Sequence, residues 1–151
     1  MKKFILSLAI LLTLFGTAFA NHPYSVTERA IISFQKDFHH AYDVSWFETN
    51  NYVRATFHQD REVLIAYYDF RGNLIGVVHN ILTISLPSNL QKDIKKYYAG
   101  YWVSELFQVT NDDGDYYYIQ LKNADETIVL SAEGTNSWQR YTTLKNKISN
   151  P

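Results

Sequence analysis

The chain of 151 residues contains no cysteine. Disulfide bonds, thiolate ligands for a metal and a cysteine nucleophile are therefore all excluded. A lipid anchor attached through an N-terminal cysteine is excluded for the same reason. If the chain is exported, its fold must be held together by side-chain packing alone.

The chain also lacks a basic stripe and a second long apolar run. Its 14 basic side chains are nearly balanced by 15 acidic ones, which leaves a net charge of −1. A nucleic-acid-binding surface needs clustered lysine and arginine, so nucleic acid is not expected as a partner. Beyond the start of the chain, no apolar run approaches the roughly 20 residues that span a bilayer. No integral membrane segment is therefore expected in the mature protein.

Motifs that would mark an active site are missing as well. There is no Gly-x-Ser-x-Gly nucleophile elbow and no glycine-rich phosphate loop. His39 and His40 are adjacent, and neighbouring helix positions point in different directions, so they are not expected to share a metal ion. Residues 111–115 are acidic but lack the ligand spacing and later glutamate of a calcium loop, which favours a hairpin turn. We expect a protein that is not an enzyme and has no cofactor or metal site.

Residues 1–20 have the three parts of a secretory signal peptide. Two lysines form the positive start, an apolar stretch follows, and Ala18-Phe19-Ala20 fits a small-x-small cleavage site. We expect cleavage after Ala20, one mature domain over residues 21–151, and a periplasmic or secreted location.

Two stretches of the chain resemble each other at a constant displacement. Phe34-Gln35-Lys36-Asp37-Phe38 matches Leu90-Gln91-Lys92-Asp93-Ile94, and the same displacement maps Trp46 onto Trp102. Self-similarity of this kind is typical of duplicated units. We predict two repeats, over about residues 26–82 and 87–144, with each of these tryptophans in a core position between helix and sheet.

Each repeat is predicted to open with a helix. Residues 25–28 and Ser88-x-x-Gln91 have the form of a capping box, in which side chains satisfy free backbone N–H groups at a helix start. Pro87 also suits the first turn of the second helix. Apolar residues then recur on one helical face: Ala30, Ile31, Phe34, Phe38 and Ala41 in the first helix, and Leu90, Ile94, Tyr97 and Tyr98 in the second.

Eight strands are predicted to follow the helices. Turn sequences such as Arg71-Gly72-Asn73 and Asp113-Gly114 separate the apolar segments. Apolar and polar side chains alternate within several of these segments, which is typical of an antiparallel sheet with one face on a core and one in water. We place the strands near residues 43–49, 52–59, 62–70, 73–84, 101–110, 115–122, 127–133 and 137–144. The predicted fold class is α+β, a tandem repeat of helix plus antiparallel strands with the helices packed on one face of the sheet.

The opposite face of this sheet is predicted to be exposed and rich in tyrosine. The chain contains 12 Tyr, and tyrosine and arginine are enriched where proteins bind one another. The alternative is that these are ordinary solvent-facing strand residues without a binding role. The candidate protein-binding residues are Tyr52, Arg54, His58, Tyr116, Tyr118 and Gln120, with Thr56 between them and no apolar neighbours expected on that face.

Short motifs in a fixed order resemble those of a known family. They are Val44-x-Trp46, Tyr52-x-Arg54-Ala55-x-Phe57, Ala66-Tyr67-Tyr68-Asp69-x-x-Gly72, Leu86-Pro87, Tyr97-x-x-Gly100-Tyr101 and Asp113-Gly114-x-x-Tyr117-Tyr118. Over residues 28–135, their order and spacing are similar to those of the PepSY-like family, also described as β-lactamase-inhibitor-like. The resemblance implies a small exported bacterial protein with a tandem helix-plus-sheet fold. The family name implies similarity to a protein inhibitor that grips an enzyme with a concave sheet.

These observations lead to an expected function. An exported domain without a catalytic constellation acts by contact, so we expect a non-catalytic module that binds an unidentified protein, in the manner of an enzyme inhibitor, through its sheet face. The alternative is a protein that binds a small ligand or an envelope glycan on its aromatic face.

Overall fold

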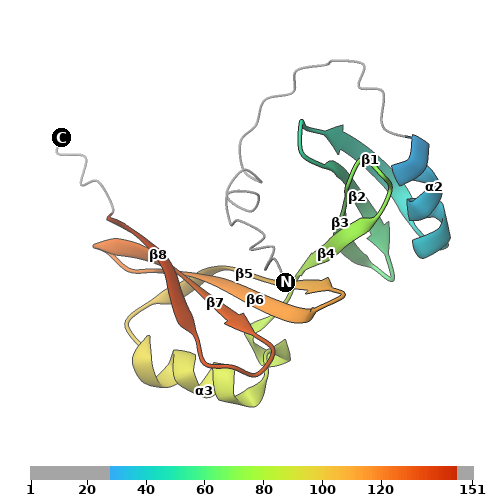
Figure 1. Ribbon diagram of the computed structural model, residues 1–151. Helices are drawn as coiled ribbons and strands as arrows, with labels where there is room; N and C mark the ends of the chain where they lie inside the picture. Colours follow the sequence, from blue (N-terminus) through green and yellow to red (C-terminus); the bar gives the residue numbers. More distant parts are fainter. Residues whose placement is uncertain (1–27, 146–151) are drawn as a thin grey trace.

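The computed structural model describes residues 28–145, which form an antiparallel sheet and two α-helices (Figure 1). Helix α2 spans Glu28–Asp37, helix α3 spans Ser88–Tyr97, and a short 3-10 helix, η2, spans Thr83–Ser85. The strands are β1 (Tyr42–Glu48), β2 (Val53–Gln59), β3 (Glu62–Tyr68), β4 (Leu74–Asn80), β5 (Trp102–Asn111), β6 (Gly114–Lys122), β7 (Glu126–Glu133) and β8 (Gln139–Lys145). The predicted signal peptide and the start of the first capping box lie outside the described residues.

The eight predicted strand positions are confirmed, and the largest difference is at the end of β4. The predicted strand continues to residue 84, but β4 ends at Asn80 and the chain turns through η2 into α3. Gln91 holds this turn, because its side-chain amide donates hydrogen bonds to the carbonyls of Ile84 and Leu86. The capping box predicted for Ser88 and Gln91 is therefore wrong, and α3 starts after Pro87 without a side-chain cap.

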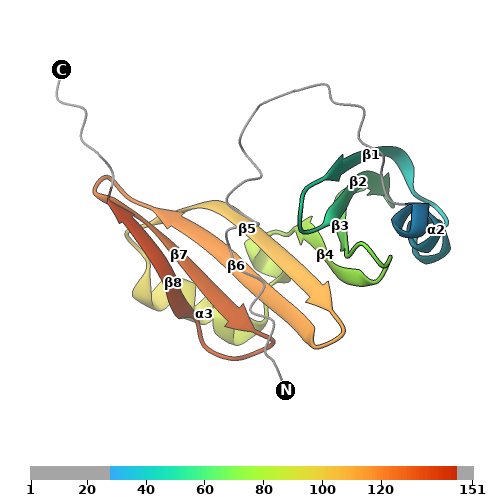
Figure 2. The same cartoon turned by 45° about the horizontal axis from the view of Figure 1, so that its top comes forward.

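The strands form a single sheet in which each strand pairs with the next one in the sequence. All of these pairs are antiparallel. Strands β4 and β5 join the two halves of the sheet through four residue pairs, from Val77–Thr110 to Asn80–Phe107. Figures 1 and 2 show the sheet turning sharply at this junction, with α2 beside one half and α3 beside the other.

The predicted fold class, a tandem repeat of helix-plus-strand units, is wrong. The molecule is mostly one continuous eight-stranded sheet, and its two α-helices have only 10 residues each. An apolar cluster draws residues from both halves, so the halves share part of their core. The two tryptophans that suggested the repeat also differ, because Trp46 packs beneath α2 whereas Trp102 is 57% exposed.

Each helix covers an apolar cluster of its own. Beneath α2, the ring of Phe34 lies 4.9 Å from that of Phe57 and 5.2 Å from that of Trp46. Beneath α3, Leu90 is fully buried, and the indole N–H of Trp138 donates to its carbonyl. In the cross-strand register, the sheet residues of both clusters lie on the same side of the sheet. Within residues 28–145, no helix packs on the opposite side.

That opposite side, which we call the inner face, carries a third cluster. Its buried members are Tyr67, Val78, Phe107, Val109 and Val129. Tyr67 is 3% exposed and Val109 is 2% exposed, although no helix of the described chain lies over them. Partly buried neighbours on the same face pack against these residues; they are Tyr52, Ile65, Ile75, Tyr116 and Tyr118. Figure 2 shows the two halves of the sheet at an angle to each other.

Candidate functional site

The six predicted binding residues all lie on the inner face, in two groups. Tyr52, Arg54 and His58 are at or within β2, and Tyr116, Tyr118 and Gln120 are in β6. The predicted alternation is confirmed, because the residues between them point toward the helices and are buried. Strands β3, β4 and β5 separate the two groups. The structure therefore places both groups on one face without bringing them into one compact site.

The residues between the two groups were missed by the sequence analysis. Tyr67 and Val78 are buried there, together with Phe107 and Val109. The expectation that this face carries no apolar residues is therefore wrong. The sequence of β3 contained a usable indication, because residues 63–68 are apolar or aromatic without alternation, a pattern typical of a strand that is buried on both faces.

Aromatic contacts connect the predicted tyrosines to this central cluster. The rings of Tyr52 and Tyr67 meet edge to face, with centroids 5.3 Å apart. The rings of Phe107 and Tyr118 stack at 5.5 Å, and Tyr141 of β8 meets Tyr118 edge-on at 6.4 Å. Tyr52, Tyr116 and Tyr118 are consequently half-buried and pack against the inner-face cluster instead of standing free in water. Burial raises the pKa of Tyr118, and burial followed by the charge of Glu133 raises that of Tyr116.

Arg54 lies in a cross-strand row between Phe47 and Tyr67. Its guanidinium carbon is 4.8 Å from the centroid of the Phe47 ring, a cation–π contact that holds the charged group against β1. The Arg54 Nε and the Tyr67 hydroxyl are both buried without a hydrogen-bond partner. Burial raises the pKa of Tyr67, and the nearby charge of Arg54 opposes part of this rise. The positive charge of Arg54 thus acts on the Tyr67 hydroxyl across the two paired strands.

The remaining predicted residues are held by their neighbours on the sheet. The ring of His58 stacks on that of Tyr42 at 5.3 Å, while its Nδ1 is buried without a partner. The side-chain amide of Gln120 donates to the hydroxyl of Ser104 at 3.0 Å, and that hydroxyl donates to the backbone carbonyl of Gln120 at 3.1 Å. The side chain of Gln120 is therefore engaged in hydrogen bonding within the sheet.

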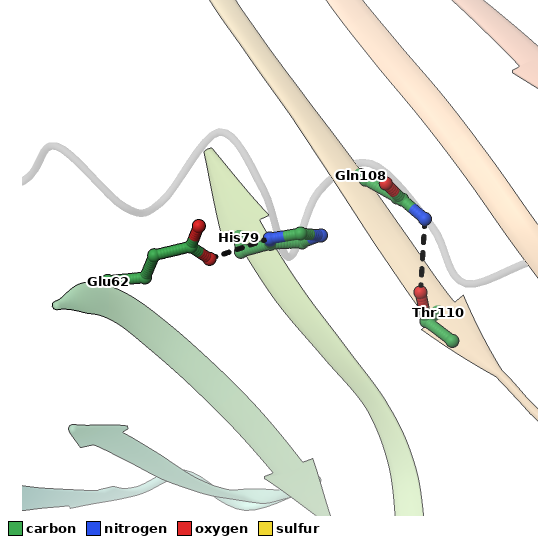
Figure 3. Close-up of polar contacts among 4 residues, drawn as sticks. All are labelled: Glu62, His79, Gln108 and Thr110. Atoms are coloured by element: carbon green, nitrogen blue, oxygen red, sulfur yellow. Dashed lines mark hydrogen bonds and ion pairs between the residues drawn. The ribbon is translucent and has the colours of Figure 1, made fainter. Parts of the chain in front are cut away.

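A polar row crosses the other side of the sheet, where β3, β4 and β5 meet. His79 Nδ1 lies 3.4 Å from a carboxylate oxygen of Glu62, and Gln108 donates to Thr110 (Figure 3). Thr110 in turn donates to Asp115 at 2.6 Å. No group of three histidine, aspartate or glutamate side chains within residues 28–145 is arranged to hold a metal ion. These contacts join β3 to β4 and β5 to β6, on either side of the β4–β5 junction.

The acidic segment 111–115 is the hairpin that the sequence analysis favoured. The side-chain oxygen of Asn111 accepts hydrogen bonds from the backbone N–H groups of Asp113 and Gly114. Asn111 and Gly114 are paired at the end of β5 and β6. The hairpin predicted for this segment is therefore confirmed.

A pocket of about 350 Å³ lies beside α2, apart from the inner face. Apolar and aromatic side chains dominate its lining, which is typical of small-molecule sites. Trp46 is one of them, so this tryptophan packs under α2 and also borders an open cavity. The pocket is lined by Ile31, Phe34, Gln35, Phe38, His39, Ala41, Val44 and Trp46.

The curled eight-stranded sheet with two short helices is a BLIP-like fold, as comparison with solved structures shows. A BLIP-like protein from Bacteroides fragilis matches with a TM-score of 0.68 and 12% identity, over 82% of this chain and 89% of that chain. A DUF2874 family protein from Bacteroides ovatus matches with a TM-score of 0.68 and 15% identity, over 78% and 86%. A Bacteroides eggerthii protein provisionally described as periplasmic matches with a TM-score of 0.68 and 10% identity, over 78% and 87%.

Comparison of the sequence with protein-family models and with curated proteins finds no match. At 10–15% identity, the structural neighbours establish the fold and leave the activity open. Within residues 28–145, no helix is long and apolar enough to cross a membrane.

Proposed function

We propose that this protein is an exported, non-catalytic binding module that holds a protein partner against the inner face of its sheet. The observation that carries the proposal is the composition of this face. It combines half-buried tyrosines and an arginine with a buried apolar cluster, and no helix of the described chain packs over it. Tyrosine and arginine around a desolvated apolar centre are what protein-binding hot spots require.

The shape and size of the inner face also support a protein partner. A standard interface buries about 800 Å² on each side, and a face that crosses most of an eight-stranded sheet can provide that area. The BLIP-like fold adds an analogy, because the β-lactamase-inhibitor-like resemblance described above implies a protein that grips an enzyme with a concave sheet. Inhibition of an envelope or secreted enzyme is therefore the specific form of contact that we propose.

Export and family membership belong to the same proposal. The signal-peptide pattern of residues 1–20 supports export to the periplasm or beyond, as does the neighbour that is provisionally periplasmic. The motif order described above supports a relationship to PepSY-like proteins.

Photo-crosslinking tests the proposal in living cells. A photoreactive amino acid at Tyr116 should capture one defined protein, which mass spectrometry identifies. The same amino acid at Ile32, which is 59% exposed on α2, is the control and should not capture it. Capture from α2 instead of the inner face would contradict the proposal.

Once the partner is known, its affinity can be measured by calorimetry for two face variants. Thr56→Glu and Ser131→Arg each place a larger charged side chain on the inner face, in β2 and β7, and should weaken binding at least tenfold. Thr143→Arg is the matched control, because Thr143 pairs with the buried Ile128 of the α3 cluster and so lies on the other side of the sheet. Equal affinity for all three variants would show that the partner binds elsewhere.

A small-ligand binding protein is the second candidate, and the pocket beside α2 is the observation that favours it. Its volume lies within the range of small-molecule sites, and Trp46 in its wall provides a fluorescent reporter. Titration with envelope lipid and glycan extracts should quench Trp46 emission in a variant that carries Trp102→Phe and Trp138→Phe, and adding Val44→Arg, which fills the pocket, should abolish the effect. No change in emission with any extract would dismiss this candidate.

A further inference from the structure

The charged side chains of the inner face are unevenly placed. Arg54 and His58 lie on β2, in the half that α2 supports. Glu105 of β5 is paired with Gln120, and Glu133 of β7 is paired with Tyr116. Because Gln120 and Tyr116 point to the inner face, these two carboxylates lie on that face as well. Lys122, two residues after Gln120 in β6, also lies there, so the far half carries two carboxylates and one lysine.

Two of the buried polar atoms that lack a hydrogen-bond partner belong to cross-strand neighbours, the Nε of Arg54 in β2 and the hydroxyl of Tyr67 in β3. A third, the Nδ1 of His58, lies four residues further along β2, roughly 13 Å away on an extended strand. Buried polar groups are nearly always hydrogen-bonded, and one left without a partner costs about 1–3 kcal/mol. A ligand that pairs with the Arg54 guanidinium must bring acceptors.

Arg54 forms no ion pair with the residues that the structure describes, and its guanidinium is held in place by the Phe47 ring. A guanidinium that is fixed before binding loses little conformational freedom when an anion arrives, and its planar donors match the two oxygens of a carboxylate. Such a pair on a partly desolvated face is stronger than the same pair in water.

We propose that Arg54 is the ion-pairing residue of the inner face and receives a carboxylate side chain of the protein partner. This inference rests on the proposed function and adds its chemistry: the partner places an aspartate or glutamate at the β2–β3 end. Phe47 positions the guanidinium. The far half carries Glu105 and Glu133 beside a single lysine, Lys122, and so attracts a carboxylate less than Arg54 does.

The resonance of the Arg54 Nε–Hε group gives a direct test in the purified protein. The probe is the blocked peptide acetyl-(Ala-Glu)₃-amide, and the matched control is the same peptide with glutamine. We expect the glutamate peptide to shift the Arg54 resonance in a saturable way and the glutamine peptide to leave it unchanged. Equal shifts with both peptides, or equal displacement by inorganic phosphate, would overturn the inference.

Two substitutions separate this subsite from general electrostatic attraction. Arg54→Gln should weaken binding of the glutamate peptide at least tenfold, and Arg54→Lys should restore only part of the affinity. Arg140→Gln removes a positive charge from β8, where Arg140 donates to Thr143, and should leave the affinity within twofold. If Arg140→Gln weakens binding as much as Arg54→Gln, the effect is non-specific. Thermal unfolding of each variant confirms that it is folded.

The crosslinked partner distinguishes a failure of this inference from a failure of the proposed function. If Ser131→Arg abolishes partner binding but Arg54→Gln does not change it, the inner face is the binding surface and the carboxylate subsite is wrong. If neither substitution changes the affinity, the proposed function itself is wrong. If both reduce it, the inference and the proposed function stand together.

Discussion

At the scale of single residues, left-handed backbone conformations mark where the hairpins turn. Asp60 and Arg61 have φ angles of 51° and 68°, which allows β2 and β3 to be joined by two residues. Gly72, in the β3–β4 turn, has a φ of 86°. The carboxylate of Asp69 holds that turn by accepting hydrogen bonds from the backbone N–H groups of Arg71 and Asn73. The turn at Gly72 was predictable from the sequence, because glycine adopts a left-handed backbone conformation more readily than other residues.

Gly72→Ala is expected to destabilise the protein by about 2–3 kcal/mol, because the strain of a left-handed backbone and a steric clash both oppose the alanine side chain. A Cβ at this position would lie 2.8 Å from the carbonyl oxygen of Arg29, so the turn could no longer approach α2. Urea denaturation measures the loss. Gly100→Ala is the control, because a Cβ there meets no atom within 4 Å, and its stability should equal that of wild type. Equal stability of the two variants would contradict this account of the turn.

At the scale of elements, the positions of the strands were predictable from the sequence, but the side chains that pack against each face of the sheet were not. Period-two alternation in β2 and β6 placed Val53 and Ile119 correctly toward a core. The same alternation does not tell how side chains of neighbouring strands pack over one another, and such packing surrounds Tyr67 and Val109 on the other face. The prediction therefore found the residues of the candidate face but mistook a half-buried face for an open one. The prediction that Trp46 and Trp102 occupy equivalent core positions was wrong for a related reason, since the exposure of each side chain depends on which elements pack nearby.

The two tryptophans should respond very differently to truncation. Trp46→Ala should cost about 2–3 kcal/mol, because the indole packs against Phe34 beneath α2 and its removal leaves a gap. Trp102→Ala should cost less than about 1 kcal/mol, since more than half of this side chain is already in water. Chemical denaturation of both variants provides the comparison. Similar losses would restore the view that the two positions are equivalent.

At the scale of the whole molecule, tyrosine makes the fold sensitive to alkali. Burial is the main cause that raises the pKa of Tyr67, Tyr68, Tyr117 and Tyr118. For Tyr68, whose hydroxyl donates to Asp37 at the end of α2, the carboxylate adds to the rise. Stability from these groups is fully present below the ordinary tyrosine pKa of 10.0. Above it, the unfolded chain loses protons before the folded chain does, which favours unfolding.

The free energy of unfolding is therefore expected to be nearly constant from pH 8 to 9.5 and to fall steadily above pH 10. Each unit by which folding raises the pKa of one tyrosine corresponds to ~1.4 kcal/mol of stability that is lost at high pH. Urea titrations across this range measure the fall. Tyr68→Phe should make it shallower, because this variant removes one of the shifted groups, while costing about 1 kcal/mol at pH 8 for the lost hydrogen bond. A fall as steep as in wild type would show that Tyr68 does not contribute.

The order of the strands has a kinetic consequence. Since every strand pairs with its predecessor in the sequence, most contacts close only a short loop, and chain entropy opposes them weakly. The exception is the pairing of β4 with β5. It forms only four residue pairs and closes a longer loop, residues 81–101. Forming the β4–β5 junction therefore loses the most chain entropy. Each half of the sheet is expected to form before the two halves join. A chain that acquires its structure after crossing a membrane would then complete the inner face in the last step of folding.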